Sequence, residues 1–127
     1  MEEGRYERGY KRLVEVNASA ADRVVETMQE LNPDLARYLV EFAYGDIYGR
    51  PGLDLKSRQI AAIAALTALG TAGPQLKIHI HGALNAGCQR QEVVEVILQT
   101  AIYAGFPAAT NGIRIAGEVF MERQANQ

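Results

Sequence analysis

Apolar residues recur along this chain at helical spacing, three and four positions apart, while runs that alternate between apolar and polar residues are scarce. Helices are therefore expected over about 3–16, 19–31, 34–48, 55–69, 74–87 and 91–105, and from 107 onward. The pattern predicts an all-α fold of about six or seven helices in a single domain, 1–127, with a helical arm at 1–18.

Capping residues define the ends of these helices. Ser19 is expected to cap the second helix, Asn32-Pro33 to begin the third, Asp54 to cap the fourth, and Gly87 to end the fifth. Within the helices, large apolar residues at helical spacing are expected to face inward, among them Leu35, Leu39, Phe42 and Ile102.

Composition narrows the class of protein. The chain has 127 residues, 48% of them hydrophobic, a formal net charge of −2 and one cysteine, Cys88. This charge gives no general attraction to nucleic acid or to an anionic membrane, and no apolar run approaches the roughly 20 residues of a membrane span. One cysteine allows neither an intrachain disulfide nor a thiolate zinc site. These features are typical of a cytoplasmic protein whose partners are small molecules or copies of itself.

The two histidines, His79 and His81, lie on one predicted helix. Two positions correspond to about 200° around a helix, so the two imidazoles point to nearly opposite sides. His79 shares its side with apolar residues and His81 shares its side with Lys77 and Asn85. This spacing does not suit a metal site, and His79 is the better candidate for chemistry. From the helical pattern alone, the ordinary interpretation is a core or interface histidine satisfied by a hydrogen bond.

A segment without acidic residues runs from Leu55 through Gln91 and carries Lys56, Arg58, Lys77 and Arg90. Such a segment suits an anion, although the same cations could pair with carboxylates of other helices. Arg58 lies one turn into an apolar helix, where its guanidinium needs a carboxylate from the protein or from a substrate.

The segment Phe42 to Asp54 reads FAYGDIYGRPGLD and places aromatic and charged groups close together. Tyr44 and Tyr48 share one helical face, and with Asp46 and Arg50 they could line a cleft. Aromatic residues in this pattern are also ordinary core or interface residues with a polar tip.

Three ordered blocks carry a family resemblance: 42–54, then LKIHIHGALNAG at 76–87, then AIYAGFPAA at 101–109. Together they resemble the carboxymuconolactone decarboxylase family over residues 33–122. The resemblance implies the alkyl hydroperoxidase D-like (AhpD-like) helical fold, a homo-oligomer, usually a trimer or hexamer, and no cofactor. The redox branch of that superfamily has Cys-x-x-Cys-x-x-x-His with an upstream Glu. Here Ala72 and Gln75 stand at the cysteine positions, and no acid occurs around 59–61, so dithiol peroxide reduction is not expected.

The reaction that the resemblance implies is loss of CO2 from a carboxylated muconolactone to give 3-oxoadipate enol-lactone, in the degradation of aromatic compounds. His79 is the candidate general acid or oxyanion donor, and Arg50 or Arg58 would hold the retained carboxylate of a small anionic lactone or keto acid. Tyr44, Asp46 and Tyr48 are candidates for positioning or proton relay. Two alternatives remain open: a redox protein in which Cys88 pairs between subunits, and a non-catalytic oligomer that binds a ligand.

Overall fold

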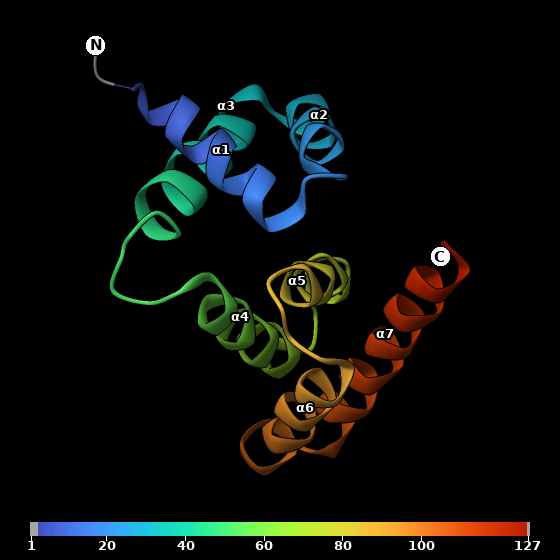
Figure 1. The fold of residues 1–127 in the computed structure, drawn as a ribbon. Helices are drawn as coiled ribbons and strands as arrows, with labels where there is room; N and C mark the ends of the chain where they lie inside the picture. Colours follow the sequence, from blue (N-terminus) through green and yellow to red (C-terminus); the bar gives the residue numbers. More distant parts are fainter. Residues whose placement is uncertain (1–2, 127) are drawn as a thin grey trace. The chain divides into compact units, whose positions relative to one another are not determined.

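The computed structural model describes residues 3–126, which form seven α-helices and one π-helix and contain no strand (Figure 1). The elements are α1 (Arg5–Asn17), α2 (Ala21–Leu31), α3 (Pro33–Tyr38), the π-helix η1 (Leu39–Ile47), α4 (Leu55–Leu69), α5 (Gly73–Asn85), α6 (Arg90–Ala104) and α7 (Phe106–Ala125). The predicted all-α class and the helix count are confirmed. Within the described residues, no helix is long and apolar enough to cross a membrane.

The helices divide into two compact units, 1–55 and 56–127, each with its own apolar cluster. In the first unit, α1 packs on η1 around Leu13, Val16, Val40 and Tyr44. The two helices approach closely at Gly9, where an added Cβ atom would lie 1.9 Å from the carbonyl oxygen of Val40. The expected single domain stays a prediction.

The helix predicted over 34–48 is not one regular α-helix. After α3 the backbone widens into η1, as the bond from the Tyr48 amide to the Ala43 carbonyl five residues earlier shows (2.9 Å). The wider turn places Val40 and Tyr44 inward, so the expectation for Phe42 was wrong: its side chain is 56% exposed. The inward orientation predicted for Leu35 was also wrong.

Capping was predicted correctly at Asn32 and incorrectly at Ser19. The Asn32 side-chain oxygen accepts from the Leu35 amide (3.0 Å), and Pro33 occupies the first turn of α3. At the start of α2 the N-cap is Ala20, without a side-chain cap, while the Ser19 hydroxyl contacts the Asn17 side chain at 3.4 Å.

The second unit is built around Ile63 of α4, Ile80 of α5, Ile97 of α6 and Val119 of α7, all 0% exposed. Figure 1 shows α7 as a long C-terminal helix, and α7 packs against both α5 and α6. Gly87 ends the α5 segment with a φ of +102°, a conformation that favours glycine, as predicted. The inward position expected for Ile102 was wrong, since this side chain is 76% exposed in the single chain.

Candidate active site

His79 lies on α5 and is half-buried. One turn away on either side, Leu76 and Ala83 are buried in the core of the second unit. The interpretation of this helix side as an inward-facing apolar stripe is therefore confirmed. Burial of the imidazole lowers the pKa of His79 below its ordinary value, because desolvation disfavours the charged form. At neutral pH the ring is consequently uncharged.

The partner of this imidazole is Gln59 of α4. The His79 Nδ1 atom lies 2.8 Å from the Gln59 side-chain oxygen. Gln59 is 0% exposed, and its amide nitrogen, Nε2, has no hydrogen-bond partner among the described residues. The sequence carried a signal of the burial of Gln59, though not of its contact with His79: Gln59, Ile63 and Thr67 repeat every four residues and form the buried side of α4.

His81 lies in a polar cluster of the same unit. Its Nε2 atom is 3.1 Å from Glu122 of α7, and its Nδ1 atom is 3.2 Å from the Arg123 guanidinium. Lys77 pairs with Glu122, and Arg123 also donates to Asn85. The two sides of α5 therefore differ as expected: the side of His79 is apolar and the side of His81 is polar.

Two of the four cations of the acid-free segment pair with carboxylates on later helices. Lys56 pairs with Glu92 at 3.2 Å, and Lys77 pairs with Glu118 and Glu122. These two lysines therefore pair with carboxylates of the protein itself, which was the alternative to binding an anion. Arg58 is half-buried on α4, directly before Gln59 in the sequence.

Four other predicted site residues, Tyr44, Asp46, Tyr48 and Arg50, belong to the first unit. The Tyr44 and Tyr48 ring centroids are 5.1 Å apart. Tyr44 is 5% exposed, and burial raises the pKa of its hydroxyl to about 12. A hydroxyl with so high a pKa keeps its proton at neutral pH, which suits hydrogen bonding rather than proton release.

Asp46 makes a bidentate contact with Arg5 of α1. The Arg5 Nε atom lies 3.1 Å from both carboxylate oxygens, and an Nη atom also donates. The hydrogen bond from Arg5 lowers the pKa of Asp46. This carboxylate is therefore ionised at neutral pH and serves as an acceptor, which limits its use as a proton donor.

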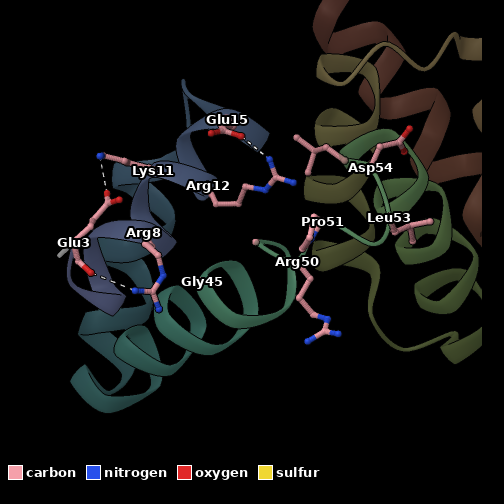
Figure 2. Close-up of a pocket in the computed structure, with 12 residues that line it drawn as sticks. Glu3, Arg8, Lys11, Arg12, Glu15, Gly45, Arg50, Pro51, Leu53 and Asp54 are labelled. Carbon is pink, nitrogen blue, oxygen red and sulfur yellow. Dashed lines mark hydrogen bonds and ion pairs between the residues drawn. The ribbon is translucent and has the colours of Figure 1, made fainter.

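A cavity of about 570 Å³ lies between α1 and the segment after η1 in the first unit (Figure 2). Its charged lining consists of Arg8, Lys11, Arg12, Arg50, Glu3, Glu15 and Asp54. Lys11 pairs with Glu3 and Arg12 pairs with Glu15, whereas the Arg50 side chain extends away from both pairs. Because charges of both signs line this cavity, it is not a strongly basic site.

Cys88 is 5% exposed and packs in the core of the second unit. Burial raises the pKa of its thiol, so the reactive thiolate is disfavoured. Among the described residues, no group of three or more His, Cys, Asp and Glu side chains is placed to hold a metal ion.

The sequence of this chain is similar to the sequences of several known proteins. The chain is 34% identical to the 4-carboxymuconolactone decarboxylase of Acinetobacter baylyi over 122 residues, which are 95% of this chain and 90% of that protein. It is also 34% identical to an uncharacterized 15.0 kDa protein of Paracoccus denitrificans, over 77% of this chain and 74% of the relative.

A third relative is the nitrosuccinic acid decarboxylase of Metarhizium robertsii, 34% identical over 55% of this chain and 48% of that protein. Two of the three names describe decarboxylases, which supports an activity of that kind. The sequence profile of the carboxymuconolactone decarboxylase family matches residues 33–118, more than half of the chain. This match and the nearly full-length relative make the chain a member of the carboxymuconolactone decarboxylase family.

Proposed function

We propose that this protein is a cofactor-independent decarboxylase that converts a carboxylated muconolactone into 3-oxoadipate enol-lactone and CO2. The observation that carries the proposal is the 34% identity to a 4-carboxymuconolactone decarboxylase over 95% of the chain. The half-buried, hydrogen-bonded imidazole of His79 provides a group suited to the required proton transfer.

The chemistry follows from the substrate. The bond between the γ carbon and its carboxylate breaks, and CO2 leaves. The electron pair moves through the conjugated double bond into the lactone carbonyl, which becomes a dienolate oxygen. A proton then adds at the α carbon and gives the enol-lactone. The substrate contains its own electron sink, so the protein has to bind an anion, stabilise an oxyanion and supply one proton.

In this proposal His79 supplies the proton. Its imidazole is neutral before the substrate binds, because burial lowers its pKa. A dianionic substrate next to the ring favours the protonated form, so the ring gains a proton as the complex forms. The resulting imidazolium can stabilise the dienolate oxygen or protonate the α carbon.

Arg58, in the same unit as His79, would hold the retained carboxylate, since a guanidinium suits bidentate carboxylate binding. The substrate-binding roles of Arg50, Tyr44 and Tyr48, which belong to the first unit, stay predictions. Asp46 would hold Arg5 rather than carry a proton.

Turnover of the lactone, followed by its ultraviolet absorbance, tests the proposal. We expect His79→Asn to lower kcat roughly 10²- to 10⁴-fold, the usual contribution of general acid–base catalysis, with the melting temperature and assembly state retained. His81→Asn is the matched control, because it changes a histidine on the polar side of the same helix, and its kcat should remain near that of the native protein. Equal activity of His79→Asn and the native protein would disprove the role of His79, and absence of turnover by the native protein would disprove the substrate.

We also infer that copies of this chain associate through the turn between α6 and α7. Residues 96–113 contain no Asp, Glu, Lys or Arg. Ile102, Tyr103 and Phe106 are each more than 75% exposed, next to an apolar hollow of about 270 Å³ that includes Leu98 and Ile113. An uncharged apolar surface of this kind is complementary to itself, as contact between identical subunits requires.

A further inference from the structure

We propose that Gln59 is a positioning residue that fixes the neutral imidazole of His79 as the tautomer protonated at Nδ1, so that Nε2 is the nitrogen that exchanges a proton with the substrate. The assignment of the tautomer rests on the geometry around Gln59, and its consequence for catalysis rests on the proposed function. Neither the family match nor the names of the relatives assign a role to Gln59.

The first argument is the hydrogen bond itself. The Gln59 side-chain oxygen is an acceptor, and it lies 2.8 Å from His79 Nδ1. An acceptor at this distance requires the proton on Nδ1, and the other ring nitrogen then carries the lone pair of the neutral ring. An amide oxygen accepts from Nδ1 whether or not Nε2 is protonated. The ring can therefore gain and lose a proton at Nε2 without breaking this bond or turning.

The second argument is that a glutamine at this buried position is unfavourable for the stability of the fold. Gln59 is 0% exposed, and its Nε2 atom has no hydrogen-bond partner among residues 3–126. A buried amide donor without a partner is unfavourable, and a leucine or methionine of similar size would avoid that penalty on a helix side shared with Ile63. A residue that is poor for packing but correctly placed against the candidate catalytic group suggests selection for function.

The third argument concerns charge. A carboxylate at position 59 would also accept from Nδ1, but it would stabilise the imidazolium and keep His79 charged before the substrate binds. A neutral amide orients the ring without adding charge. Gln59 therefore allows protonation of His79 to depend on the anionic substrate.

The test uses nuclear magnetic resonance of the imidazole nitrogens, without any substrate. The chain has two histidines, so His81→Asn leaves His79 as the single signal. In that background, long-range proton–nitrogen correlations above the pKa of the ring should show the proton on Nδ1. Gln59→Leu should move the ring toward the Nε2-protonated form. Gln59→Glu should retain the Nδ1 proton and shift the titration of the ring to higher pH.

Activity measurements form the second arm. We expect Gln59→Leu to lower kcat about tenfold or more, the size of effect known for residues that orient metal-binding histidines, with an unchanged or higher melting temperature. Gln59→Glu should recover part of the activity and displace the pH profile of kcat upward. A proton on Nε2 in the native protein, or the same tautomer in Gln59→Leu, would overturn the inference. If no lactone is turned over, the proposed function fails, whereas the tautomer result stands on its own.

Discussion

Arg5 and Asp46 form a bidentate ion pair in the first unit, joining α1 to η1 through two oxygens of one carboxylate. Because the folded state lowers the pKa of Asp46, the unfolded chain binds a proton more readily. The pair therefore stabilises the fold above the ordinary aspartate pKa of about 3.9, and this contribution is lost as the pH falls through the lower, folded value.

We predict that Asp46→Asn reduces the free energy of unfolding near pH 7, and that this effect shrinks as the pH falls below the ordinary aspartate pKa of about 3.9. The side chains of Arg5 and Asp46 are 47% and 35% exposed, so solvent and salt screen the pair and the loss should shrink at high ionic strength. Urea denaturation at several pH values measures it. Asp34→Asn is the control, because Asp34 forms a more exposed pair with Arg37 within one helix. A destabilisation by Asp46→Asn that is equal at all pH values would contradict the electrostatic explanation.

At the scale of elements, close backbone contact between α1 and η1 decides the packing of the first unit. The Gly9 position is buried, and a methyl group there would meet the backbone carbonyl of Val40 rather than a movable side chain. Gly45 of η1 lies on the same contact, where an added Cβ atom would lie 3.5 Å from the Gly9 Cα atom. Two small residues therefore allow the two helices to approach.

We predict that Gly9→Ala destabilises the protein toward the upper end of about 1–3 kcal/mol, the range for overpacking, although alanine is the better helix former. Gly117→Ala is the matched control: Gly117 lies inside α7, and an added Cβ meets nothing within 4 Å. That change should stabilise by about 0.5–1 kcal/mol through helix propensity alone. Thermal denaturation of both variants measures the contrast. Similar melting temperatures for the two variants would show that the α1–η1 contact can relax.

At the scale of the whole molecule, the exposed apolar residues of the α6–α7 turn predict association. Each such side chain contributes about 1.5–3 kcal/mol when it is fully buried, so several together can hold subunits in contact. Light scattering after size-exclusion chromatography should give a mass that is a multiple of the 13.9 kDa chain.

Ile102→Lys should shift this assembly toward the single chain, because it places a charge in the proposed contact. Met121→Lys is the control, since Met121 is 73% exposed on α7 but lies outside residues 96–113. A native protein that elutes with the mass of one chain, or equal effects of the two lysines, would refute association through this turn.

The helical class and most helix boundaries could be predicted from the sequence, because they depend on local properties: apolar spacing, Asn32-Pro33 at a helix start and Gly87 at a helix end. Local pattern also separated the apolar side of His79 from the polar side of His81. The residue types in three blocks of the sequence were enough to predict the family, and the match over residues 33–118 confirmed it.

The remaining features depend on contacts between helices and became visible only in the folded chain. The inward orientation expected for Phe42 assumed regular α-helical turns, and the wider π-helical turn placed Val40 and Tyr44 inward instead. The contact between Gln59 and His79 joins residues 20 positions apart on different helices, and helical periodicity within either helix carries no information about the distance between them. Nothing in the sequence around Gln59 marks this glutamine as a functional residue. Its candidate role comes from two features of the structure: its hydrogen bond to His79, and its amide nitrogen, which has no partner among the described residues.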